Sequence, residues 1–143
     1  MKTLLLILFA LLAVNVASAE PDTCDYSQVV SAGVHVYDGS RDGRNLLLDA
    51  EQIAALQALD GTAYTGDYYA FRDHLQAIYH VDYVNTDATI QRLWIVVSWR
   101  EGKFFAIPTG KFNVSPDGLE SENHPCRLPF EVSYDTVRGI IEP

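Results

Sequence analysis

The segment that most constrains the fold is residues 90–100, which is almost continuously apolar and rich in β-branched and aromatic side chains. Such a run is typical of a strand that is buried on both faces. Residues 101–102 are Glu-Gly, and the apolar pattern resumes over residues 103–107. A two-residue turn at this point would place Trp99 opposite Phe104. We therefore expect a β-hairpin whose first strand lies in the middle of a sheet.

Shorter patterns predict the remaining elements. Apolar residues that alternate with polar ones indicate half-buried strands. Apolar residues at helical spacing that follow Asp49 and Asp67 indicate two helices, each with an aspartate as its N-cap. The predicted strands are residues 29–38, 46–48, 111–114, 130–134 and 137–141, and the predicted helices are residues 50–59 and 68–80. This order predicts a two-layer α+β fold, in which an antiparallel sheet has two helices packed on one face.

The N-terminal residues have the pattern of a secretory signal peptide. Lys2 precedes an apolar run over residues 4–14, and Ala-Ser-Ala at residues 17–19 provides a cleavage site with small residues. The run is shorter than the roughly 20 apolar residues that a membrane-spanning helix needs. We expect cleavage after residue 19, which leaves residues 20–143 as a single exported domain, periplasmic or secreted, with no membrane anchor.

Cys24 and Cys126 are the two cysteines of the chain. An exported protein folds in an oxidising compartment, where a pair of thiols normally forms a disulfide. The two residues have no Cys-x-x-Cys spacing, which is the usual spacing for redox chemistry. The sequence therefore predicts a structural disulfide between Cys24 and Cys126.

The chain is acidic, with a formal net charge of −9 at pH 7. A surface of this charge repels the phosphates of nucleic acids and the head groups of anionic lipids. We therefore expect no nucleic-acid partner and no binding to an anionic membrane surface.

Oxygen-bearing residues follow the spacing of a calcium loop from residue 38 onward. Asp38, Ser40 and Asp42 stand at loop positions 1, 3 and 5. Gly43 follows at position 6, and Asp49 stands at position 12, where the family has a bidentate Glu. Over this stretch the chain resembles the EF-hand and dockerin calcium loops, which implies a calcium site. We expect instead a simple turn and no cofactor, with a calcium-stabilised accessory module as an alternative.

Histidines and acids are the candidates for catalysis. On the predicted helix 68–80, Tyr69, Asp73 and His80 share a polar stripe, and Asp82 follows closely. The sequence contains no Gly-x-Ser-x-Gly elbow, no His-Glu-x-x-His and no phosphate-binding glycine loop. An exported hydrolase that uses His80 with nearby acids is therefore an alternative, and the lack of catalytic motifs favours binding over catalysis.

Tyrosines are concentrated between residues 64 and 83. Tyr64, Tyr69 and Tyr83 lie outside the apolar stripe of the predicted helix, so we expect them to be exposed. Tyrosine is enriched at protein interfaces. The sequence therefore favours a small exported binding or inhibitor-type module that recognises a protein or peptide partner through these three rings.

Overall fold

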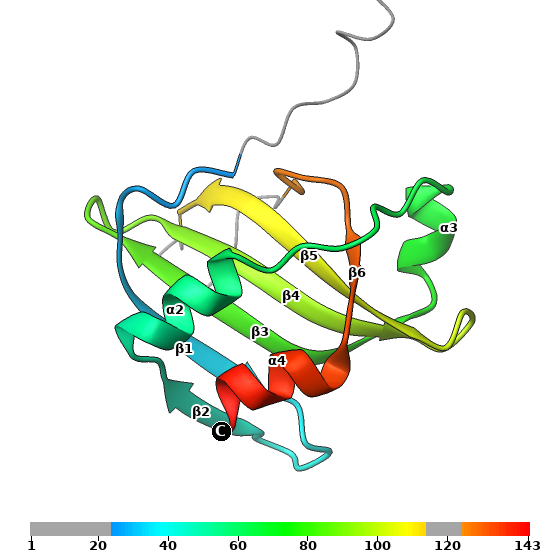
Figure 1. Cartoon of the computed structure of the whole chain (residues 1–143), viewed down its shortest axis with the longest axis horizontal. Helices are drawn as coiled ribbons and strands as arrows, with labels where there is room; N and C mark the ends of the chain where they lie inside the picture. Colours follow the sequence, from blue (N-terminus) through cyan, green and yellow to red (C-terminus); the bar gives the residue numbers. More distant parts are fainter. Residues whose placement is uncertain (1–23, 114–123) are drawn as a thin grey trace, which may run out of the picture.

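The computed structural model of the protein describes residues 24–113 and 124–143. Six strands form one antiparallel sheet in the order β2-β1-β3-β4-β5-β6 (Figure 1). The strands are β1 (Val29–Val36), β2 (Arg44–Leu47), β3 (Leu75–Asn85), β4 (Ile90–Ser98), β5 (Lys103–Phe112) and β6 (Phe130–Val132). The helices are α2 (Ala50–Gln57), α3 (Tyr68–Arg72) and α4 (Tyr134–Ile141). The predicted signal peptide, residues 1–19, and residue 114 of the predicted strand 111–114 lie outside the described residues.

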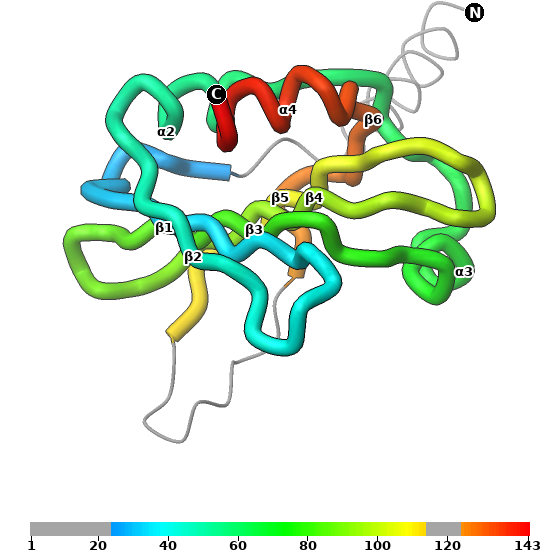
Figure 2. The backbone as a smooth tube through the Cα atoms, turned by 90° about the horizontal axis from the view of Figure 1, so that it is seen from below, coloured from blue at the N-terminus to red at the C-terminus, as the bar shows by residue number. Residues whose placement is uncertain are grey.

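Helices α2 and α4 lie on one side of the sheet, as the edge-on view in Figure 2 shows. One hydrophobic cluster joins this layer to the sheet, and its members include Leu56 of α2, Val137 and Ile141 of α4, and Val34, Val81 and Ile95 of the strands. Helix α3 is in a second cluster, where Phe71 packs against Val96, Phe105 and Ile107. The fold is therefore α+β, as predicted, with the sheet as its larger part.

Helix α2 begins as the sequence predicts. The carboxylate of Asp49 accepts a hydrogen bond from the backbone N–H of Gln52 at 2.8 Å, and the Gln52 side chain accepts one from the backbone N–H of Asp49 at 2.9 Å. This capping box satisfies two N–H groups at the start of the helix. The Gln52 amide also donates to the carbonyl of Ile140 at 2.9 Å. The cap of α2 is thus tied directly to α4.

The predicted helix 68–80 is wrong beyond its start. Helix α3 follows the N-cap Asp67, as predicted, but it ends at Arg72, and β3 begins at Leu75. From Tyr79 onward every second side chain of β3 is buried, which is the period of a strand. Strand β3 pairs with β1 along one edge and with β4 along the other. Pairing along both edges stabilises the strand and overrides the local helical pattern. The predicted packing of two helices, 50–59 and 68–80, on one face is therefore not confirmed.

Residues 137–141, predicted as a strand, belong to helix α4. Ser133 is the N-cap, and its hydroxyl accepts a hydrogen bond from the backbone N–H of Thr136 at 3.4 Å. Val137 and Ile141 are four residues apart and both are buried in the core. A short apolar run fits a strand or a buried helix equally well. The serine cap ahead of the run is the signal that favours the helix.

The predicted hairpin is present, and β4 lies in the interior of the sheet between β3 and β5. Its turn is longer than predicted, because residues 99–102 all belong to it. Gly102 has a φ of 67°, a conformation that glycine adopts readily. The predicted pair of Trp99 and Phe104 is wrong: Val97 faces Phe104, and Trp99 is 64% exposed in the turn.

The predicted disulfide is confirmed. Cys24 and Cys126 are bonded, with their Cα atoms 5.1 Å apart. The bond ties the chain ahead of β1 to the segment between β5 and β6. In the described part of the chain, no helix has the length and apolar character that crossing a membrane would require.

Glu142, directly after α4, connects the C-terminus to two strands. Its carboxylate accepts hydrogen bonds from the Arg44 guanidinium of β2 at 2.6 Å and from the Tyr79 hydroxyl of β3 at 2.7 Å. These bonds, that from Arg44 first, hold the pKa of Glu142 below its ordinary value. The stabilisation is therefore complete above the ordinary glutamate pKa of about 4.3 and is lost as the pH falls through the lower pKa of the folded state.

We predict that Glu142→Gln reduces the acid sensitivity of the protein. The difference in melting temperature between pH 7 and pH 3 should be smaller for the variant than for the wild type, because position 142 of the variant has no carboxylate that loses its hydrogen bonds on protonation. Glu131→Gln is the control, since Glu131 forms an exposed ion pair with Lys103 and such pairs contribute at most about 1 kcal/mol. An unchanged difference in Glu142→Gln would contradict the role assigned to this carboxylate.

Candidate functional site

Polar and aromatic side chains form a row across the sheet face opposite α2 and α4. We call this the open face. Antiparallel pairing places Asn45 of β2 opposite His35 of β1, His35 opposite His80 of β3, and His80 opposite Trp94 of β4. Paired residues of neighbouring strands point to the same face of a sheet. Four consecutive strands of the sheet therefore contribute one side chain each to the row.

Contacts along the row hold its side chains in place. The rings of His35 and His80 stack with their centroids 5.2 Å apart, and the rings of His80 and Trp94 form a T-shaped pair with their centroids 5.1 Å apart. His35 Nδ1 donates to the Asn45 side-chain oxygen at 2.8 Å. The Tyr37 hydroxyl is hydrogen bonded to His80 Nδ1 at 2.9 Å. The row is thus rigid, which lowers the entropy cost of binding a ligand against it.

An ion pair lies beside the row. Arg92 of β4 donates from Nε and Nη2 to the two carboxylate oxygens of Asp82, at 2.6 Å and 3.0 Å. The Arg92 guanidinium also lies over the rings of Trp94 and Phe112, with its Cζ 5.2 Å and 5.5 Å from their centroids. His80 Nε2 is 3.7 Å from the Asp82 carboxylate. Arg92 therefore neutralises Asp82 and supports one face of the Trp94 ring.

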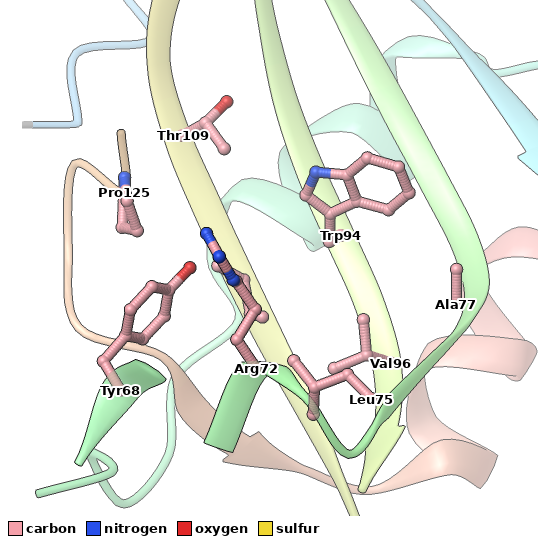
Figure 3. A pocket seen from close by; sticks show the side chains of 9 residues that line it. Tyr68, Arg72, Leu75, Ala77, Trp94, Val96, Thr109 and Pro125 are labelled. Atoms are coloured by element: carbon pink, nitrogen blue, oxygen red, sulfur yellow. The ribbon is translucent and has the colours of Figure 1, made fainter. Parts of the chain in front are cut away.

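A pocket of about 240 Å³ lies between α3 and the open face (Figure 3). Its walls are mainly apolar, and Figure 3 shows the Arg72 side chain extending from α3 over β5 into it. Burial raises the pKa of the Tyr68 hydroxyl, which therefore remains a hydrogen-bond donor at neutral pH. The lining residues are Tyr68, Arg72, Leu75, Ala77, Trp94, Val96, Ile107, Thr109 and Pro125.

A second pocket, of about 360 Å³, lies at the turn between β1 and β2. Ala77 of β3 lines both pockets, so the two are neighbours on the open face. Gly43 has no room for a side chain here: a Cβ at this residue would lie 2.6 Å from the carbonyl oxygen of Val36 and 2.7 Å from His35 Nε2, and its φ is 63°. The lining residues are His35, Tyr37, Gly39, Ser40, Arg41, Gly43, Gln76 and Ala77.

The structure separates the three tyrosines predicted to be exposed. Tyr69 is 73% exposed on α3. Tyr64 is half-buried and stacks on Phe71 at 4.2 Å. Tyr83 is completely buried, so the expectation that it is exposed is wrong: it lies on β3, on the face covered by α2 and α4, where its ring meets Tyr26 at 5.3 Å. A joint contact of all three rings with one partner is therefore excluded.

The residues of the calcium-like loop have other partners. Asp38 accepts from the backbone N–H of Ser40 at 3.0 Å and from Arg44 at 3.1 Å. The hydrogen bonds from Ser40 are the main cause that lowers the pKa of Asp38. Asp49 is the N-cap of α2. Among the described residues, which include Asp42, no three His, Cys, Asp or Glu side chains lie close enough together to hold a metal ion. The calcium alternative gains no support from these contacts.

Of the residues proposed for the hydrolase alternative, the structure brings His80 and Asp82 together. The strand conformation of β3 removes His80 from the helical stripe that it was expected to share with Tyr69 and Asp73, and Asp73 instead ends α3 as its C-cap. Asp82 does lie beside His80, on the same face of the strand. An imidazole between a phenol and a carboxylate can exchange protons with a ligand, so acid–base chemistry at His80 remains a hypothesis.

Tyr37, Arg72 and Trp94 were not predicted as site residues from the sequence. The register of β1, β3 and β4 brings Tyr37 and Trp94 to His80, and the early end of α3 places Arg72 in the wall of the same pocket as Trp94. The available signal was the alternation of apolar and polar residues from Tyr79 to Asn85, which favours a strand and would have placed His80 on the face opposite Tyr79.

Comparisons with protein-family models, with curated proteins and with solved structures found no match to this chain. The function proposed below therefore depends on the geometry of the open face alone.

Proposed function

We propose that the protein is a binding domain, and that an extended peptide segment of a partner protein lies across the open face. One observation carries the proposal: a fixed row of aromatic and imidazole rings runs between two neighbouring pockets on the sheet face opposite α2 and α4. Ligand sites combine apolar walls with a few placed polar groups. The pocket beside α3 has this character, and the second pocket adds the polar side chains of His35, Ser40 and Gln76.

An extended peptide fits this surface better than a compact ligand does. The pockets are neighbours through Ala77, and an extended chain presents a side chain to the same side at every second residue. Two such side chains can enter the two pockets while the backbone crosses the row. The exposed ring of Tyr69 on α3 supplies a further contact at the rim.

Binding is favoured over catalysis by the state of the polar groups. Both ring nitrogens of His80 already face a partner, Tyr37 on one side and Asp82 on the other. Both carboxylate oxygens of Asp82 already accept hydrogen bonds from Arg92. Acid–base hydrolysis at His80 is the second candidate, supported by the Tyr37–His80–Asp82 contacts.

We predict that Trp94→Ala weakens peptide binding by about 30-fold, because a central aromatic contact of about 2 kcal/mol is lost. Linear decapeptides are selected from a random library on the purified wild-type protein, and their dissociation constants are measured by fluorescence anisotropy. Trp99→Ala is the matched control: Trp99 is the other tryptophan, exposed in the β4–β5 turn and outside both pockets. Its dissociation constants should change less than twofold.

Trp94 is half-buried, so the melting temperature of each variant is measured alongside binding. Trp94→Phe, which keeps a ring against His80, should recover most of the affinity. Equal binding of the selected peptides to wild type and Trp94→Ala would refute the proposal. Mass spectrometry of the incubated peptides tests the second candidate: cleavage by the wild type and not by His80→Gln would establish hydrolysis instead.

A further inference from the structure

The pocket beside α3 combines apolar walls with one charged residue. Leu75, Trp94, Val96 and Ile107 form its walls, and among the described residues that line it, Arg72 alone carries a charge. The polar Thr109 is already engaged, since its hydroxyl donates to the carbonyl of Arg92 at 3.0 Å and accepts from the N–H of Arg92 at 3.1 Å. Arg72 is therefore the group that can select a ligand by charge.

Arg72 has no carboxylate partner among the described residues. The ring of Tyr69 lies near it, with its centroid 5.9 Å from the guanidinium carbon. Arg44 and Arg92, in contrast, each bind a carboxylate at 2.6 Å. An arginine that extends over an apolar pocket with its five N–H donors unmatched complements an anion attached to an apolar group. This local charge is opposite in sign to the net charge of −9 of the chain.

We propose that this pocket binds the C-terminal residue of the peptide, with an apolar side chain against Trp94 and Ile107 and the terminal carboxylate on Arg72. This inference rests on the proposed function. Within a peptide, a C-terminal apolar residue is the unit that carries an apolar side chain and a carboxylate together. An internal apolar residue has no charge, and an aspartate or glutamate side chain has too little apolar surface to fill the walls. The preceding residues then cross β3 at Ala77 toward the second pocket.

The test compares two peptides that differ in one group. The probes are the acetylated pentapeptide Ala-Thr-Ala-Thr-Leu with a free C-terminal carboxylate and the same peptide as the C-terminal amide. In a Trp99→Phe background, Trp94 is the remaining tryptophan, and its emission reports occupancy of the pocket. The free acid should bind about tenfold more tightly than the amide, equivalent to about 1.4 kcal/mol. Added salt should reduce this difference.

Variants of Arg72 locate the carboxylate. Arg72→Gln should bring the affinities of acid and amide within twofold of each other, and Arg72→Lys should keep part of the difference because it keeps the charge. Arg72 is exposed, so neither change should lower the melting temperature by more than a degree or two. Arg100→Gln is the matched control, since Arg100 is an exposed arginine that does not line this pocket, and it should leave the preference for the acid intact.

Each contrary outcome has a separate meaning. If the selected peptides require Trp94 but acid and amide bind equally, the chain-end proposal is overturned and the binding function stands. If the selected peptides do not require Trp94, the proposed function itself fails. Tighter binding of 3-phenylpropanoate or octanoate than of the pentapeptide acid would also overturn the chain-end proposal, because a small apolar acid would then be the better occupant of the pocket.

Discussion

Replacing Cys24 and Cys126 together by alanine should lower the free energy of unfolding by about 4 kcal/mol. The disulfide joins residues 102 apart in the sequence, and the entropy that it removes from the unfolded chain corresponds to about 4.7 kcal/mol for a loop of this length, with native-state strain reducing the observed value. Domains typically unfold at a cost of 5–15 kcal/mol. The double variant should therefore lose a large part of its total stability.

Urea denaturation of the wild type and the double variant, followed by far-UV circular dichroism, measures this loss. Wild-type protein in the presence of a reductant should unfold at the midpoint of the double variant, which controls for effects of the alanines themselves. A loss below about 1 kcal/mol would mean that the unfolded chain retains structure that keeps the two cysteines close. A disulfide-bonded fold is compatible with the export that the N-terminal residues predict, since cytosolic thiols are kept reduced.

Gly61→Ala should destabilise the protein by about 3 kcal/mol or more. A Cβ at Gly61 would lie 1.8 Å from the carbonyl oxygen of Glu131. That oxygen belongs to the backbone of β6, which is held next to this segment by a hydrogen bond from the N–H of Glu131 to the carbonyl of Thr62 at 2.9 Å. The added methyl group must therefore push two backbone segments apart, which belongs at the upper end of the roughly 1–3 kcal/mol that overpacking typically costs.

Gly139→Ala is the matched control for this substitution. Gly139 lies inside α4, is exposed, and has no atom within 4 Å of the position that a Cβ would take. Alanine is favoured over glycine in a helix interior by about 1 kcal/mol, so this variant should be more stable than the wild type. The urea midpoints of the two variants should therefore move in opposite directions. Equal shifts of the two urea midpoints would show that β6 moves away from residue 61 without a loss of folding free energy.

The parts of the fold that were predictable from the sequence are those with a single local interpretation. The strand predicted at residues 90–100 is present over Ile90–Ser98, and the helix predicted from the capping box at Asp49 is present as α2. Residues 75–80 and 137–141 are different, because their apolar residues satisfy the period of a helix and of a strand over a short run. Contacts with residues distant in the sequence determine which structure forms. Residues 75–80 become a strand because they pair with β1 and β4, and residues 137–141 form a helix whose apolar side packs in the hydrophobic core.

The candidate site was less predictable for the same reason. His80 was identified as a candidate, but its neighbours His35 and Trp94 are brought to it by strand register, which residue spacing does not reveal. Tyr83 was misplaced because the helical pattern put it outside the core, whereas strand alternation puts it inside. Asp82 was placed near His80 correctly, since two residues apart on a strand means the same face.

Strands β1 and β3 are direct neighbours in the sheet, although the chain between them contains β2, α2 and α3. This intervening segment supplies the rims of both pockets, with Arg41 at one end and Arg72 at the other, while β3, β4 and β5 supply most of the floor of the pocket beside α3. The three floor strands pair with one another as consecutive hairpins. Under the proposed binding function, exchanging short rim segments would change the ligand preference while the floor strands stay the same, in the way that antibody loops vary on a common framework.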